Sequence, residues 1–346
     1  MNGALDAVNR LARTLVAEES SLPGPALRDP ARLLETLQLA LGPEGLDADE
    51  VIGRMGGVLK ATPSSSSWRF LNQLFGGREP IATAAEMLTA LPNVSMYTYK
   101  AAGAQVLVEK EVLGYMLAKV GFDHGEGCFT PGGSMANLVA MLLARNEIMP
   151  DSRDHGLGAH RLTIYTSAEG HYSILKNAGI VGIGRHNVRR ISAMQDGRMD
   201  ARALARQLAR DRAEGLRPFF VNATAGTTVR GAFDPIRAMA GLCREHDAWL
   251  HVDGALGGSL VLSSTHCHLV DGAELADSYS WNPHKMMGVP LQASVLLVAR
   301  RGTLARSLDE TADYLYQADA DDLNPGHQSL LCQADLSGKR PRHAVW

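Results

Sequence analysis

The chain has 346 residues, 45% of them hydrophobic, with 34 basic and 37 acidic side chains and a formal net charge of −3. A chain of this size and apolar content can bury a large core, and it suits one large domain with a smaller appendage. The near balance of charge argues against nucleic acid or an anionic membrane as a partner and favours a small molecule.

The cysteines and the N-terminus indicate the cellular compartment. Cys128, Cys243, Cys267 and Cys332 lie far apart and form no CxxC pair, which favours reduced thiols over a disulfide framework or a zinc site. The first 21 residues mix charged with apolar side chains, so they lack the apolar core of a signal peptide. No apolar run reaches the length of a membrane span, and we expect a cytoplasmic protein.

The N-terminal third of the chain is predicted to be helical. Apolar residues recur there with the spacing of one helix face, interrupted by proline and glycine. Helices are predicted at residues 4–17, 31–41, 82–90 and 105–120. The first two form a predicted N-terminal arm.

Helix and strand patterns alternate beyond residue 121. Helices are predicted at 134–149 and 200–214 and from 235 onward, and strands at 162–166, 218–222 and 248–252. Asp200 and Asp234 are the expected N-caps of the second and third helices, the latter with Pro235 at its first position. This alternation predicts a mainly parallel sheet with helices on both faces, and ligands bind at the carboxyl ends of the strands in such sheets.

A lysine and an aspartate near two of these strand ends suggest a cofactor. Lys285 lies in Trp281-Asn282-Pro283-His284-Lys285, between two strand-like segments, where an amine can be held and partly desolvated to form a Schiff base. A single lysine is more often a solvated surface charge. However, residues 249–253 read as a buried strand that ends in Asp253, the carboxylate that a pyridinium nitrogen requires. Together they predict a pyridoxal phosphate site.

Three further turns could contribute to this site. Gly132-Gly133-Ser134 opens a helix, where free N–H groups favour a phosphate. His171 follows a strand and could lie flat on an aromatic ring, and the small residues of 222–228 would let a ligand approach the backbone. Each also has an ordinary structural reading, as a helix cap, a structural histidine and a polar turn.

Five tracts in this order carry a family resemblance: PGGSMAN, SAEGHYSILK, NATAGTTVRGAFDP, WLHVDGALGGS and WNPHKMMGVPLQAS. With them the chain resembles the group II pyridoxal-phosphate-dependent amino acid decarboxylases of fold type I, from about Phe70 to about Leu331. The tracts FLNQLFGG, GTTVRGAFDP and WNPHKMMGVPLQ are most similar to the branch that acts on glutamate, aspartate and cysteine sulfinate.

The resemblance also implies an architecture. It predicts an α/β fold with a mainly parallel, seven-stranded type of sheet, and a homodimer with residues from both subunits at each site. The implied parts are an N-terminal helical segment over 1–80, a large cofactor-binding domain over 81–330, and a remnant over 331–346 that leads to a C-terminal domain largely absent here.

The matching positions imply roles for individual residues. Lys285 would form the Schiff base with pyridoxal phosphate, and Asp253 would keep the pyridine nitrogen protonated. His171 would stack on one face of the ring, with Ala255 against the other. The other cofactor contacts implied are Thr228 near the ring substituents and Gly133, Ser134, Asn282 and His284 at the phosphate.

Two further roles concern the substrate. Gln73 matches a contact to the substrate carboxylate, and Tyr314 matches the mobile-loop tyrosine that supplies a proton, with Tyr316 as a rival. The chain also departs from the family pattern. Gly254 and Leu256 replace a usual alanine and tryptophan, and Ala293 replaces a common cysteine.

The implied reaction is decarboxylation of an acidic L-amino acid to an amine and CO2. Two alternatives stay open: another fold type I lyase or aldolase, and a truncated protein that binds the cofactor but is catalytically weak or acts as a partner subunit. A metal site at His266-Cys267-His268 is not favoured, since no second ligand pair lies nearby. The arginines of 202–212 are interleaved with acidic residues and fit a solvated helix face better than a nucleic-acid patch.

Overall fold

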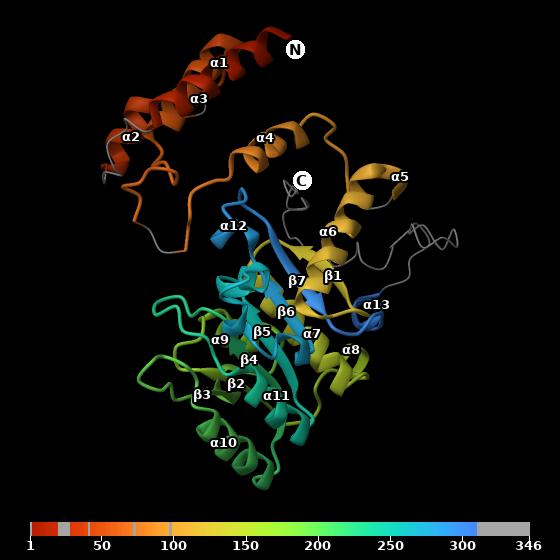
Figure 1. Cartoon of the computed structure of the whole chain (residues 1–346). Helices are drawn as coiled ribbons and strands as arrows, with labels where there is room; N and C mark the ends of the chain where they lie inside the picture. The colour runs from red at the N-terminus through yellow and green to blue at the C-terminus, as the bar shows by residue number, and fades with distance from the viewer. Residues whose placement is uncertain (1, 20–27, 41, 72–73, 97–98, 310–346) are drawn as a thin grey trace. The chain divides into compact units, whose positions relative to one another are not determined.

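The computed structural model describes residues 2–19, 28–40, 42–71, 74–96 and 99–309 (Figure 1). The chain divides into two compact units, Met1–Arg78 and Glu79–Trp346. Within the described residues, no helix combines the length and the apolar character needed to cross a membrane.

The first unit consists of helices α1 (Asn2–Glu18), α2 (Pro30–Leu37) and α3 (Ala48–Ala61). Helices α1 and α2 are those predicted, but α2 ends earlier than expected because Gln38 adopts a left-handed conformation with φ 47°. Helix α3 is not among the predicted helices. It begins at the cap Asp47, whose carboxylate accepts the Glu50 N–H at 2.8 Å.

The second unit contains one large sheet and its covering helices. Its helices are α4 (Pro80–Thr89), α5 (Tyr99–Ala102), α6 (Ala104–Val120), α7 (Gly133–Ile148), α8 (Ser152–His155), α9 (Ser173–Ile180), α10 (Ala201–Ala213), α11 (Ile236–Glu245), α12 (Pro283–Met286) and α13 (Thr303–Leu308). Its strands are β1 (Glu126–Thr130), β2 (Leu162–Ser167), β3 (Val188–Ile191), β4 (Arg217–Thr224), β5 (Trp249–Gly254), β6 (Ser278–Trp281) and β7 (Ser294–Val298). Short 3-10 helices lie at η2 (Arg185–Asn187), η3 (Gly257–Leu262), η4 (Cys267–Val270) and η5 (Ala273–Leu275).

The seven strands run in the order β1-β7-β6-β5-β4-β2-β3 (Figure 1). Five neighbouring strands, from β6 to β3, are parallel, whereas β7 is antiparallel to both β6 and β1. The predicted α/β fold with a mainly parallel sheet is therefore confirmed. Strand β7 is reversed because only the short helix α12 separates it from β6, and a parallel return needs a longer crossover.

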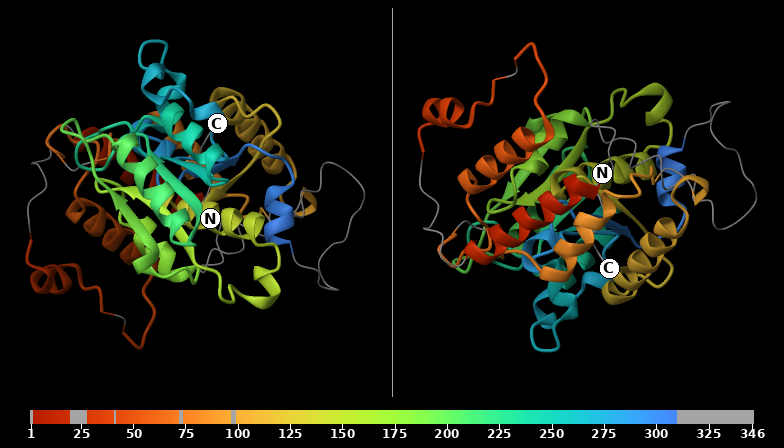
Figure 2. Two further views of the ribbon diagram at one scale, coloured as in Figure 1. Left: turned by 90° about the horizontal axis from the view of Figure 1, so that it is seen from below. Right: turned by 90° about the horizontal axis from the view of Figure 1, so that it is seen from above.

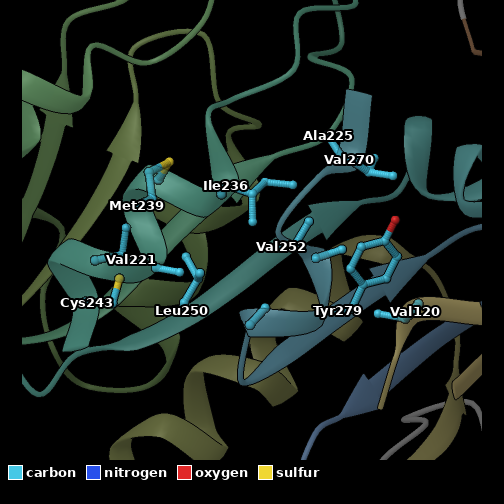
Figure 3. Close-up of a cluster of buried hydrophobic side chains, with 14 of the residues drawn as sticks. Val120, Val221, Ala225, Ile236, Met239, Cys243, Leu250, Val252, Val270 and Tyr279 are labelled. Carbon is cyan, nitrogen blue, oxygen red and sulfur yellow. The ribbon is translucent and has the colours of Figure 1, made fainter. Parts of the chain in front are cut away.

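Helices cover both faces of the sheet (Figure 2). On the face beneath α6, α10 and α11 the inward side chains are apolar; Val221, Leu250, Val252 and Tyr279 belong to this core (Figure 3). Because side chains alternate along a strand, the neighbouring positions point to the opposite face, beneath α7 and α9.

The face beneath α7 changes character along the strands. Near their amino ends the buried residues are large and apolar, such as Phe220 on β4 and Trp249 on β5. Toward the carboxyl ends they become polar, with Asn222 on β4 and His251 and Asp253 on β5. The polar groups therefore gather at the edge of the sheet where ligands bind in folds of this type.

Asp200 and Asp234 have different roles, although both are expected caps. The Asp200 carboxylate caps α10 as predicted, accepting the N–H groups of Arg202 and Ala203. The expected cap at Asp234 is wrong: Pro235 takes the cap position of α11, and Asp234 accepts the N–H groups of Met199 at 2.7 Å and Thr224 at 2.8 Å. Asp234 thus links the carboxyl end of β4 to the backbone at Met199 by hydrogen bonds.

Replacing Asp234 by Ala tests this assignment. Both N–H groups would lose their buried acceptor, so we expect the free energy of unfolding in urea to fall by at least about 2 kcal/mol. Burial raises the pKa of Asp234 to about 6, against an unfolded value of about 3.9. The carboxyl therefore stabilises the fold most when it is protonated, and the deficit of the variant should be larger at about pH 5 than at about pH 8.

The matched control is Asp196→Ala, which removes an exposed carboxylate bonded to Arg198. This change should leave the urea midpoint nearly unchanged. Similar losses in the two variants would contradict a special role for Asp234.

Candidate active site

Asp253 lies near the end of β5 and is 4% exposed. Its Oδ2 accepts a hydrogen bond from the Asn137 amide at 2.8 Å. Its Oδ1 accepts the Ala255 N–H at 3.1 Å and the Ser280 hydroxyl at 3.4 Å. These donors offset the loss of water, so a carboxylate can be held here as a hydrogen-bond acceptor.

Lys285 lies on α12, in the connection that follows β6. Its side chain is partly buried, and among the described residues no hydrogen bond or ion pair engages its ammonium group. Burial lowers the pKa of Lys285, while the charge of Asp253 raises it. A partly desolvated amine of this kind loses its proton more readily and becomes a better nucleophile.

His171 lies in the turn between β2 and α9. Its Nδ1 lies 2.9 Å from the Ser173 hydroxyl and also accepts the Ser173 N–H at 3.3 Å. Burial lowers the pKa of His171, Asp253 raises it, and Lys285 lowers it further. The Ser173 hydroxyl also accepts from the Asn137 amide, which donates to Asp253, so His171 and Asp253 share one site.

The N-terminus of α7 approaches the same site. A Cβ added at Gly133 would lie 2.8 Å from the Asn282 amide nitrogen and 3.3 Å from the Ala255 Cβ, so this close approach requires glycine. The helix starts after Gly132 without a side-chain cap. The N–H groups of Met135 and Ala136 donate to the Gly132 carbonyl oxygen, which leaves those of Gly133 and Ser134 at the start of the helix to hold an anion.

Asn282 and His284 lie on the segment that carries Lys285. The side-chain Oδ1 of Asn282 accepts the Ser294 hydroxyl at 2.7 Å. The His284 Nδ1 lies 2.6 Å from the carbonyl oxygen of Ala293 and must donate to it. Burial lowers the pKa of His284, the bond to Ala293 raises it, and Lys285 lowers it. A bound anion would favour the charged form of this ring.

Thr228 follows the carboxyl end of β4 in a closed turn. Gly226 and Thr227 both donate their N–H groups to the carbonyl oxygen of Ala232. Gly226 has φ 87°, and a Cβ there would lie 3.1 Å from the Gly257 nitrogen. The backbone geometry of this turn therefore fixes the place of Thr228, which is partly buried.

Three residues of the sequence-based prediction cannot be placed, and two further residues belong to the site. Gln73, Tyr314 and the rival Tyr316 fall outside the described residues. The structure instead adds Asn137 and Ser173, which bond to predicted site residues and have no role in the sequence-based prediction. Asn137 lies one helical turn beyond Gly133, a spacing that places both on the same face of α7.

The side chains present fit pyridoxal phosphate. The site combines a partly desolvated amine, a buried carboxylate, a neighbouring imidazole and a glycine-backed helix N-terminus. These groups match a carbonyl, a ring nitrogen, an aromatic face and a phosphate. The donor set therefore suits each functional part of that cofactor.

Comparison with known proteins identifies the class and then the family. Residues 30–332 match the family model described as the pyridoxal-dependent decarboxylase conserved domain. The crystal structure of mouse CSAD in apo form has a TM-score of 0.88 at 39% identity, covering 95% of this chain and 71% of that chain. The fold is that of a fold type I pyridoxal phosphate enzyme. The chain belongs to the pyridoxal-dependent decarboxylase family, as its tracts predict.

Two curated relatives indicate the branch. Over 325 residues the chain is 41% identical to cysteine sulfinic acid decarboxylase of Homo sapiens, covering 91% of this chain and 66% of the relative. Over 292 residues it is 41% identical to acidic amino acid decarboxylase GADL1 of Mus musculus, covering 84% of this chain and 53% of the relative. The predicted branch is confirmed, and the chain spans less than two thirds of the length of these relatives.

His251, beneath the site, makes stability depend on pH. It is 0% exposed, and burial lowers its pKa to about 4, partly opposed by Asp253. His251 binds a proton near pH 6.5 in the unfolded chain but only near pH 4 in the folded chain. Its contribution to stability is therefore lost as the pH falls through this range. Between about pH 7 and pH 4 the parent should lose up to about 3 kcal/mol more than His251→Gln, measured in urea.

His160→Gln, which changes an exposed histidine, is the control and should follow the parent. If His251→Gln lost stability in parallel with the parent as the pH falls, the claim that His251 is buried in its neutral form would be contradicted.

Proposed function

We propose that this chain binds pyridoxal phosphate and decarboxylates an acidic L-amino acid to the corresponding amine and CO2. The observation that carries the proposal is the hydrogen-bonded connection from His171 through Ser173 and Asn137 to the buried Asp253, with the partly buried Lys285 just beyond the neighbouring strand β6. The similar proteins named above, which act on cysteine sulfinic acid and acidic amino acids, support the substrate class. A homodimer, a cytoplasmic setting and domain limits near residues 80 and 330 belong to the same proposal.

Pyridoxal phosphate, when bound, supplies a carbonyl that condenses with amines and a cationic ring that takes up the electrons of a broken bond. The Lys285 amine would bond covalently to that carbonyl carbon, and the substrate amine would then replace it there. Asp253 would keep a proton at the ring nitrogen, where the positive charge makes electron uptake favourable. His171 would cover one face of the ring and Ala255 the other, which fixes the ring plane.

The phosphate would be held by the first turn of α7, with Gly133 and Ser134, and by Asn282 and His284. Thr228 would lie beside the ring substituents. By fixing the ring plane, these residues would determine which bond of a bound substrate lies perpendicular to the ring and is therefore weakened. Our predictions for substrate recognition by Gln73 and proton donation by Tyr314 complete the proposal.

Release of CO2 from labelled amino acids tests this function. With pyridoxal phosphate present, the chain should release CO2 from at least one of cysteine sulfinate, aspartate and glutamate. Lys285→Ala should lower that rate by about 10³-fold, because the reactive amine is lost. Lys119→Ala, which removes an exposed lysine on α6, is the control and should leave the rate unchanged.

Two results would contradict the proposal in different ways. Tight binding of the cofactor without CO2 from any of the three acids would reject the decarboxylase and favour a cofactor-binding partner subunit. An undiminished rate in Lys285→Ala would reject the role of that lysine alone.

A further inference from the structure

A continuous chain of buried hydrogen bonds leads to Asp253 from the far end of β5. The Trp249 indole N–H donates to the Ser278 hydroxyl at 2.8 Å. The two ring nitrogens of His251 lie 2.8 Å from that hydroxyl and 3.0 Å from the Asn137 carbonyl oxygen. The Asn137 amide then donates to Asp253 at 2.8 Å. The path thus joins strands β5 and β6 to helix α7. It lies on the sheet face beneath α7, whose buried residues are apolar near the amino ends of the strands.

Because the Asn137 amide donates to Asp253, the hydrogen-bonding roles of the other members of this path follow. A carbonyl oxygen can only accept, so His251 must carry its proton on Nε2 to donate to Asn137. Burial keeps His251 neutral, which leaves its Nδ1 as an acceptor for the Ser278 hydroxyl. That hydroxyl in turn accepts from Trp249, whose indole can only donate.

The orientation of the Asn137 amide is fixed by the same reasoning. If the amide were rotated by half a turn, its carbonyl oxygen would face Asp253 Oδ2 at 2.8 Å, an acceptor against an acceptor. That contact with the carboxylate would be repulsive, so the amide keeps its donors toward Asp253. The Nε2–H of His251, which donates to the Asn137 Oδ1, supports this orientation from the other side.

The second N–H of the same amide reaches the other side of the site. The Asn137 nitrogen lies 3.1 Å from the Ser173 hydroxyl, and that hydroxyl lies 2.9 Å from the His171 Nδ1. Ser173 can therefore accept from Asn137 and donate to His171. One amide nitrogen ties the carboxylate expected at the ring nitrogen to the imidazole expected on the ring face.

We propose that Asn137 is a positioning residue that holds Asp253 and His171 in a fixed relation, with His251 holding Asn137 in turn. The inference rests on the proposed binding of pyridoxal phosphate, but not on turnover. A donor to a carboxylate stabilises its charged form. Asn137 therefore keeps the shared proton on the ring nitrogen rather than on Asp253. Contact between Asp253 and the ring nitrogen would not by itself decide which of the two carries that proton.

The test measures the bound cofactor directly. Pyridoxal phosphate labelled with nitrogen-15 in its ring reports by NMR where the proton lies, and a fluorescence titration gives its Kd. In Asn137→Leu, which keeps the size but removes the amide, the ring-nitrogen signal should move toward the unprotonated value. The Kd should rise by about tenfold, the expected effect of losing a hydrogen bond to a charged group.

Asn146→Leu is the matched control, because it removes another buried amide of α7 that bonds to the Ser307 carbonyl instead. It should lower the Tm but leave the ring-nitrogen signal and the Kd unchanged. The pair at His251 provides a second arm. His251→Leu should move the signal in the same direction as Asn137→Leu, whereas His251→Gln, whose amide can still donate to Asn137, should restore it.

An unchanged ring-nitrogen signal in Asn137→Leu, or equal shifts in Asn137→Leu and Asn146→Leu, would overturn the proposal. If Asn137→Leu does not fold, the His251 pair decides, and identical signals in its two variants would overturn it. A parent chain that binds no pyridoxal phosphate would instead defeat the proposed function, so the two failures are distinguishable.

Discussion

The charge of the buried Asp253 carboxylate is the constraint on which the rest of the site depends. A carboxylate only 4% exposed must be surrounded by hydrogen-bond donors. Helix α7 supplies one through Asn137, β6 supplies another through Ser280, and the backbone after β5 supplies the third. The polar ends of the strands and the close seating of α7 at Gly133 follow from this requirement.

Much of the fold could be predicted because the signals are local. Alternating strand and helix patterns identify the parallel sheet, and strand ends place Lys285 and Asp253 at its carboxyl edge. Helix α3 was harder to predict, since Gly53, Gly56 and Gly57 lower its helix propensity. In the structure Gly56 allows α3 to lie against Leu11 of α1, where a Cβ would be 3.2 Å from that side chain.

Other features depend on partners that are distant in sequence. Asp234-Pro235 has the local form of a helix start, but the carboxylate bonds to Met199, which is 35 positions away. Asn137 bonds to Asp253 across 116 positions and to His251 across 114, so no short motif reveals its role. At Gly254, a departure from the family pattern, a Cβ would lie 2.6 Å from the Ser280 carbonyl oxygen, so the local backbone suits glycine.

The most direct test of the central claim is to locate the covalent attachment of the cofactor. The chain is incubated with pyridoxal phosphate, treated with borohydride to fix the cofactor on the amine that holds it, and digested for mass spectrometry. The account predicts that the pyridoxyl group is found on Lys285, with no comparable labelling of exposed lysines such as Lys119. Labelling spread over surface lysines, with Lys285 unmodified, would contradict it.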